Sequence, residues 1–208
     1  IKDRQYTMQP DSLPRRSAQT ALYHIIQAFT RWLAPILSFT ADELYEHIPG
    51  QRGESIFLEE LYPGLEDLLR TDPESTAAVE ALCAVKMEVN RALEMKRAAG
   101  ELGSSLEAEI TLYADENLAS ALALFGDELR FALITSAALV VEGVVQAPVD
   151  AVATEMRGLK LLVQKSAHDK CIRCWHHRAD VGRSPEHPAL CSRCIENIDG
   201  GGETREFA

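Results

Sequence analysis

The stretch 171–194, CIRCWHHRADVGRSPEHPALCSRC, decides the fold of the C-terminal part of the chain. It holds two Cys-x2-Cys pairs separated by 16 residues, a spacing typical of a four-cysteine zinc site. Zinc prefers a tetrahedron of thiolates, and each pair places two sulfurs on one tight turn. Four thiolates leave no open position on the metal, so we expect one structural zinc ion. The predicted ligands are Cys171, Cys174, Cys191 and Cys194.

The spacing alone leaves other uses of these cysteines open. The four thiols could form two disulfides, or one pair could be a redox dithiol, although two such pairs favour a metal. An imidazole could also replace one thiolate, and the candidates are His176, His177 and His187. Residues 168–208 contain few large apolar side chains, so metal binding should supply the folding free energy of this segment.

Cationic and aromatic side chains flank the predicted ligands. Arg173 lies inside the first cysteine pair, and Trp175 directly follows it. This combination suits an unstacked RNA base, because the ring stacks on the base while the guanidinium reaches phosphates or base edges. Alternatively, Trp175 covers the zinc site as a small apolar core. The predicted RNA-binding residues are Arg173, Trp175, Arg178, Arg183 and Arg193, with Arg15 and Arg16 as weaker candidates.

Working back from the cysteines, the first half of the chain is predicted to be helical. Apolar residues at helical spacing predict a first helix over about 12–33, which Pro35 interrupts. A capping box of Thr40 and Glu43 predicts the start of a second helix, which ends near residue 48.

A third predicted helix begins at the Asp-Pro pair 72–73, where Asp is the N-cap, and continues to about residue 100. Its apolar stripe includes Val85, Val89 and Leu93. Cys83 is expected to be a small buried hydrophobic residue of this helix. Residues 1–12 are polar and aperiodic, and residues 51–71 are expected to form a loop with an extended piece over 55–61.

The pattern changes after residue 103 to a small α/β unit. The predicted strands cover 107–113, 138–145 and 158–164, with a helix over 116–134. We therefore predict a mainly α chain with three parts: a helical domain over 1–103, an α/β junction unit over 104–167 and a zinc module over 168–208.

The composition is that of a globular chain with reduced thiols. Hydrophobic residues make up 46% of the chain, which excludes general disorder. There is no apolar run of the ~18 residues that a membrane span needs and no signal-peptide pattern, so we expect a cytoplasmic protein without membrane contact. The chain begins without a start methionine, which indicates a piece of something longer.

The net charge of −11 argues at face value against nucleic-acid binding. Its distribution weakens that objection, because the charge is 0 over 1–50, −4 over 51–100, −6 over 101–167 and −1 over 168–208. The acidic surplus thus lies in the middle of the chain, away from the predicted RNA contacts.

No catalytic constellation stands out in the sequence. There is no Gly-rich phosphate loop, no nucleotide-binding fingerprint and no nucleophile–base arrangement. The paired carboxylates at 42–43 and 59–60 are expected to be helix-start or surface residues. We predict no catalytic residue in this chain.

Three segments resemble a known family. Segment 31–44, RWLAPILSFTADEL, resembles the anticodon-binding helical domain of class I aminoacyl-tRNA synthetases of the Ile/Val/Leu/Met group, and VNRALE (89–94) with GSSLEA (103–108) resembles the long helix and strand of that group. The tail from Cys171 to residue 208 resembles the C-terminal zinc finger of bacterial isoleucyl-tRNA synthetases. A related finger closes DNA glycosylases of the formamidopyrimidine type, but these lack the helical domain.

The resemblance implies a helical bundle of the anticodon-binding type and a role in tRNA recognition. The whole enzyme would charge tRNA with isoleucine using ATP, as a monomer, in a catalytic domain upstream whose nucleotide motifs are absent from this chain. This piece alone would be inactive and would hold the anticodon stem-loop. The alternative hypothesis is a zinc-stabilised structural or protein-docking module that no RNA touches.

Overall fold

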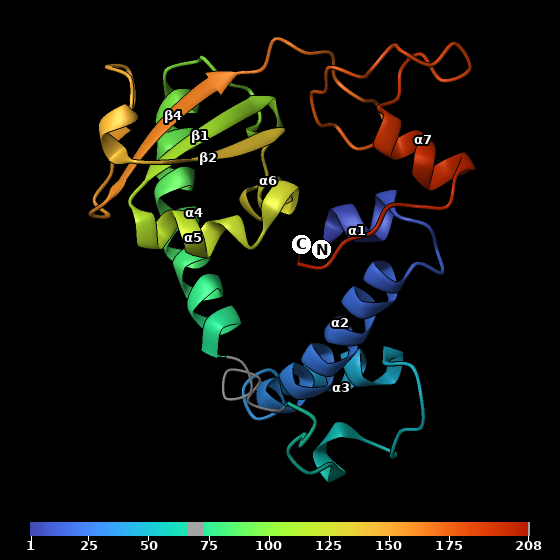
Figure 1. Cartoon of the computed structure of the whole chain (residues 1–208). Helices are drawn as coiled ribbons and strands as arrows, with labels where there is room; N and C mark the ends of the chain where they lie inside the picture. The colour runs from blue at the N-terminus through green and yellow to red at the C-terminus, as the bar shows by residue number, and fades with distance from the viewer. Residues whose placement is uncertain (66–72, 208) are drawn as a thin grey trace. The chain divides into compact units, whose positions relative to one another are not determined.

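The computed structural model describes residues 1–65 and 73–207 of the chain (Figure 1). Packing divides the chain into two compact units, namely Pro10–Thr71, and Ile1–Gln9 together with Asp72–Ala208. Among the described residues, helices predominate over one four-stranded sheet, and four cysteines cluster together, so the predicted fold class is confirmed. None of the helices in these residues has both the length and the apolar character that a membrane span requires.

The unit Pro10–Thr71 is built on two helices, α2 (Leu13–Leu33) and α3 (Ser38–His47). Its small core consists of the buried residues Ala34, Ala41, Tyr45, Ile48 and Ile56, with Ile26 and Leu33 packed against them. The chain turns between the helices at Pro35, as predicted. However, α3 begins before Thr40, with Leu37 at the N-cap, so the predicted capping box is wrong; the amide of Ala41 already bonds the carbonyl of Leu37 at 2.8 Å.

The carboxylate of Asp42 shapes the segment that follows α3. Asp42 Oδ1 accepts hydrogen bonds from the Ser55 hydroxyl at 2.8 Å and the Ile56 amide at 3.2 Å, and these bonds tie the chain down. The predicted extended piece over 55–61 is therefore wrong at its start, because Ile56–Leu58 forms a 3-10 turn, η1, that Ser55 caps. Asp42 thus has a structural role beyond the helix-start or surface position that the sequence predicted.

The second unit contains a mixed sheet in the order β2-β1-β4-β3. The central strand β1 pairs in parallel with β2 and antiparallel with β4, and β3 pairs antiparallel with β4. Residues of β1 alternate between buried and half-buried, which is the pattern of a sheet packed on one face. The three predicted strands are confirmed within a few residues: β1 covers Ala108–Ala114, β2 Ala137–Glu142 and β4 Leu159–Lys165. The short strand β3 (Val152–Ala153) was not predicted.

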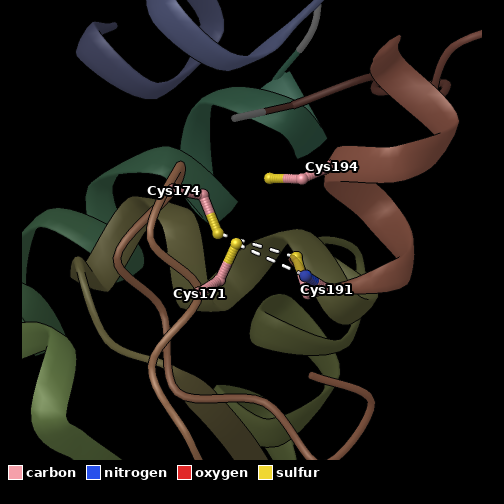
Figure 2. A group of neighbouring side chains, drawn as sticks. All are labelled: Cys171, Cys174, Cys191 and Cys194. Carbon is pink, nitrogen blue, oxygen red and sulfur yellow. Dashed lines mark hydrogen bonds between the residues drawn. The ribbon is translucent and has the colours of Figure 1, made fainter. Parts of the chain in front are cut away.

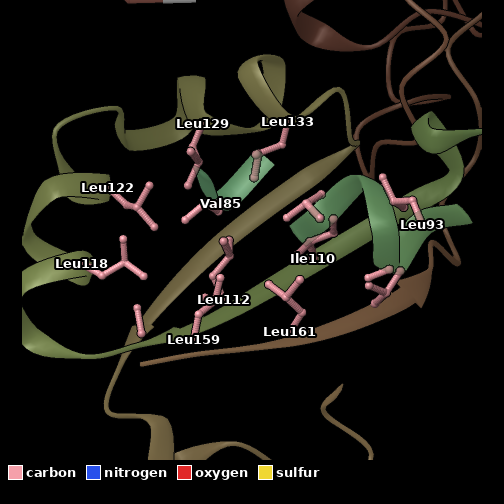
Figure 3. Close-up of a cluster of buried hydrophobic side chains, with 14 of the residues drawn as sticks. Val85, Leu93, Ile110, Leu112, Leu118, Leu122, Leu129, Leu133, Leu159 and Leu161 are labelled. Atoms are coloured by element: carbon pink, nitrogen blue, oxygen red, sulfur yellow. The ribbon is translucent and has the colours of Figure 1, made fainter. Parts of the chain in front are cut away.

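Three helices cover the packed face of this sheet: α4 (Pro73–Ala98), α5 (Glu116–Ala123) and α6 (Leu129–Leu133). Figure 3 shows their leucines pointing at the strand residues Ile110, Leu112 and Leu161. The predicted helix over 116–134 is interrupted by a 3-10 turn, η4 (Gly126–Glu128), because Gly126 adopts a φ of +47°.

The long helix α4 explains another wrong prediction. Val85, Val89 and Leu93 face the core, as their spacing predicts. Cys83, which was expected to be buried, is exposed. It precedes Val85 by two residues, about 200° around the helix, and therefore faces away from the sheet. The predicted N-cap of this helix lies outside the described residues.

The N-terminal segment contains a helix that the sequence did not predict. Lys2–Thr7 forms α1, which packs within the unit that holds the sheet, as does α4. The predicted boundaries of the three parts of the chain, at residues 103 and 167, stay predictions. The last helix, α7 (Ser192–Asp199), begins directly after the third cysteine of the predicted metal site.

Candidate metal centre and its nucleic-acid face

The two Cys-x2-Cys pairs converge into one cluster (Figure 2). Cys171 and Cys174 lie on a tight turn, whereas Cys191 caps α7 and Cys194 lies in its first turn. All four are buried, and their sulfurs lie within 4.8 Å of one another, with Cys174 Sγ and Cys191 Sγ 3.7 Å apart. A tetrahedron with Zn–S bonds of ~2.3 Å places its sulfurs about 3.8 Å apart, so the cluster fits zinc.

Backbone hydrogen bonds stabilise the turn around the first cysteine pair, residues 171–176, which we call the first knuckle. The amide of Trp175 donates to the carbonyl of Cys171 at 2.9 Å, and the amide of Cys171 donates to the carbonyl of His176 at 2.9 Å. The amide of Cys191 donates to Cys171 Sγ at 3.4 Å. The hydrogen bond between Cys174 and Cys191 lowers the pKa of Cys191 and raises the pKa of Cys174.

The alternatives to four thiolate ligands are not supported by the geometry. All five cysteines lie in the described residues and are free. His177 Nδ1 contacts the carbonyl of His168 at 2.7 Å, and His187 Nε2 contacts Asp199 Oδ2 at 2.7 Å, so both rings are engaged elsewhere. His176 packs edge-on against Phe131, and burial lowers its pKa to about 4.

Trp175 does not cover the metal site. Its side chain is 59% exposed, and Lys170 Nζ lies 5.4 Å from the ring centroid. Val181 and Leu190 pack against the cysteine cluster instead. Trp175 also has a φ of +67°, a conformation that is strained for a bulky residue and that concentrates at functional sites.

The five predicted RNA-binding residues differ in how exposed they are and in whether other residues already engage their side chains. Trp175 and Arg183 are exposed. Arg178 is half-buried, with its Nε 3.9 Å from Asp180 Oδ1, and Arg173 donates from Nη1 to the carbonyl of Thr7. RNA contact by any of these residues stays a prediction.

Arg193, the fifth of them, lies within an ion-pair network. It donates to both oxygens of Asp3 at 2.9 and 2.8 Å and to Thr7 Oγ1 at 3.1 Å, and lies 3.3 Å from Glu203. Arg205 contacts the same Asp3. Burial would raise the pKa of Asp3, but the hydrogen bonds and charge of Arg193, with those of Arg205, hold it well below its usual range. Asp3 and Arg205 were not predicted, because nothing in the local sequence connects them to the cysteines.

A cavity of about 720 Å³ lies between α1, the end of α6 and the first knuckle. Trp175 and Ile134, the two non-glycine residues with positive φ among those described, both line it. The remaining lining residues are mostly apolar or aromatic, and such a lining suits a ligand with a flat ring. They include Tyr6, Thr7, Leu106, Phe131, Arg173 and His176.

Residues 1–112 match the family described as the anticodon-binding domain of tRNA ligase, which covers more than half of the chain. The chain belongs to this anticodon-binding domain family. Residues 169–197, which include all four cysteines, match a second family, the zinc finger found in FPG and IleRS. Both matches confirm the resemblance that the sequence motifs indicated.

The chain is also similar to curated proteins over all of its 208 residues. It is 56% identical to an isoleucine–tRNA ligase of Pseudomonas putida strain GB-1, 54% identical to one of Shewanella pealeana and 53% identical to one of Stutzerimonas stutzeri. The chain spans 22% of the length of each of these relatives.

Proposed function

We propose that the chain binds the anticodon arm of a tRNA and is the anticodon-binding part of an isoleucine–tRNA ligase. The match of residues 1–112 to the anticodon-binding family carries this proposal. The exposed face of the zinc knuckle supports it, because Trp175 combines a free aromatic ring with neighbouring cations and a cavity.

In the proposed complex, an unstacked base of the anticodon loop stacks on Trp175 beside the cavity. Arg173 is held with its guanidinium at the cavity wall, where it reaches a base edge or phosphate. Arg178 and Arg183 contact the RNA backbone. Arg193 contributes indirectly, since its guanidinium is engaged by Asp3.

The zinc site supports this function structurally. One zinc ion held by four thiolates has no open coordination position, so its role is to fold the knuckles that present Trp175. Catalysis lies outside this chain: the whole ligase charges its tRNA with isoleucine using ATP in another domain of the same polypeptide, as a monomer in the cytoplasm. Because the chain carries a charge of −11, binding depends on placed contacts rather than on long-range attraction, and the chain alone binds weakly.

The rival hypothesis makes the zinc module a docking element without RNA contact. The bonds from Arg193 and Arg173 to α1 show that the module does dock within its own unit. Docking engages Arg193 and a single donor of Arg173, Nη1, and it leaves Trp175 exposed, so it is compatible with RNA binding.

The test uses anticodon stem-loop RNAs of an isoleucine tRNA and a valine tRNA, with binding followed by fluorescence anisotropy of labelled RNA. Stacking on one base is worth ~1–3 kcal/mol, so Trp175→Ala should raise the Kd about 5- to 150-fold. Ile172→Ala is the matched control, because Ile172 is an apolar residue of the same knuckle that is 67% exposed. Equal Kd values for Trp175→Ala and the unaltered chain would contradict the stacking role. Failure of the chain to bind the isoleucine stem-loop would contradict the proposed function.

A further inference from the structure

Asp3 connects three parts of the fold that are far apart in the sequence. It lies in the first turn of α1 and accepts hydrogen bonds from Arg193 of α7 and from Arg205 of the C-terminal tail. The side chains of Arg193 and Arg205 are only 11% and 1% exposed. Glu203 of the tail lies 3.3 Å from each of these arginines, so Asp3 is the carboxylate that links both of them to α1.

The two arginines also pack against one aromatic ring. Phe131 of α6 has the guanidinium of Arg205 3.3 Å and that of Arg193 4.9 Å from its ring centroid. His176 of the first knuckle meets the same ring edge-on at 5.4 Å. Because the ring and the guanidinium groups are closely packed, Arg193 cannot move to a new partner without disturbing the knuckle.

Helix α1, which contains Asp3, also forms part of the surface around Trp175. One turn after Asp3, the carbonyl of Thr7 accepts the hydrogen bond from Arg173, the residue two positions before Trp175. Asp3, Tyr6 and Thr7 line the same cavity as Trp175. If α1 left its place, Arg173 would lose its acceptor and the cavity would lose one wall.

We propose that Asp3 is a positioning residue for RNA recognition: through Arg193 and Arg205 it docks α1 against the zinc module, and α1 in turn fixes Arg173 and Trp175 in their RNA-contacting arrangement. This inference rests on the proposed function for its RNA step only. The fixing of Trp175 is a property of the free chain. Asp3 itself touches no RNA.

The first experiment needs no RNA. The chain contains two tryptophans, Trp32 and Trp175, so a Trp32→Phe background leaves Trp175 as the only indole reporter. In that background, Asp3→Asn should increase the acrylamide quenching and lower the fluorescence anisotropy of Trp175. Asp3→Glu keeps the carboxylate and should restore most of the difference. Asp11→Asn is the matched control, because it removes the same charge from an exposed residue outside this network.

The second experiment measures the Kd of the isoleucine stem-loop for the same variants. Removing a negative charge should by itself strengthen RNA binding. We expect the opposite for Asp3→Asn, a Kd that rises roughly 2- to 30-fold, in the range of coupling carried through packed networks. Asp11→Asn should leave the Kd unchanged or slightly lower. Zinc content and the helical circular dichroism signal should match those of the unaltered chain.

The outcomes separate the two proposals. Unchanged Trp175 quenching in Asp3→Asn would overturn the positioning role, as would a variant that also loses its zinc, since Asp3 would then serve folding alone. A looser Trp175 with an unchanged Kd would overturn the RNA step. If the unaltered chain does not bind the stem-loop while Asp3→Asn still loosens Trp175, the proposed function fails and the fixing of Trp175 by Asp3 stands.

Discussion

Asp3 and Arg193 face each other through two hydrogen bonds of 2.8 and 2.9 Å, although 190 residues separate them in the chain. The pair joins the first helix to α7, which contains Cys194 and begins directly after Cys191. The N-terminal segment and the metal-binding segment therefore form one cooperative structure, and a change in one should affect the other.

A double-mutant cycle should measure this coupling. Arg193→Met leaves Asp3 with Arg205 as its remaining partner, and breaking a buried pair in this way should destabilise the chain by about 3 kcal/mol. The double variant Asp3→Asn/Arg193→Met should lose less than the sum of the single losses, because both remove one interaction. Urea unfolding followed by Trp175 fluorescence in the Trp32→Phe background provides the free energies. Arg157→Met, at an exposed arginine, is the control, and additive losses would contradict the coupling.

Removal of the metal should unfold the zinc module and release α1. In the described residues 168–207, the cysteine cluster is the only buried hydrophobic cluster. We therefore expect the folding of this segment to depend on the ion. Hydrogen exchange after chelation should show lost protection in this segment and in residues 2–7, while β1 keeps its protection. Cys194→Ser should act like the chelator. Protection of residues 2–7 that survives chelation would show that α1 does not depend on the metal-loaded module.

Thiol labelling should separate Cys83 from the metal ligands. Cys83 is exposed on α4, whereas the four clustered cysteines are at most 7% exposed and would be bound to zinc. A maleimide should modify one thiol rapidly in the zinc-loaded chain and four more after chelation. Cys83→Ala should abolish the rapid reaction. A second fast thiol before chelation would show that the cluster does not hold the metal with all four sulfurs.

Glu59 should stabilise the helical unit in a pH-dependent way. Its carboxylate accepts hydrogen bonds from the Tyr45 hydroxyl at 2.6 Å and from Arg31 at 2.8 Å, which lower the pKa of Glu59. Such a group contributes stability above its ordinary pKa of about 4.5, and this contribution is lost as the pH falls through the lowered value. Glu59→Gln should therefore cost about 1 kcal/mol at pH 7 and less below pH 4.5.

Thermal unfolding at several pH values checks this prediction. Glu60→Gln is the matched control, because Glu60 is exposed and it is its backbone carbonyl that Arg31 contacts. An equal loss in both variants, or a loss for Glu59→Gln that does not change with pH, would argue against the role of this carboxylate.

The predictions that succeeded depend on local patterns. The spacing of Val85, Val89 and Leu93 predicted the inner face of α4, and the alternation around Leu112 predicted β1. Local patterns failed where a partner outside the window decides the conformation. Ile56 belongs to a 3-10 turn because Asp42 accepts its amide. The break in the predicted helix over 116–134 is different, because its cause, Gly126, is a local residue that permits a turn.

The cysteine cluster belongs to what the sequence by itself determined, because two short Cys-x2-Cys turns predict a tetrahedral thiolate site without reference to the rest of the chain. The surroundings of that site were decided only by the tertiary structure. Arg193 looked like an RNA contact and pairs with Asp3, while Trp175 could cover the zinc or face solvent and does the latter. The physical reason is the distance along the chain over which each feature is decided. Cysteine spacing sets a local geometry, whereas the partner of a guanidinium and the exposure of a ring depend on distant segments that only folding brings together.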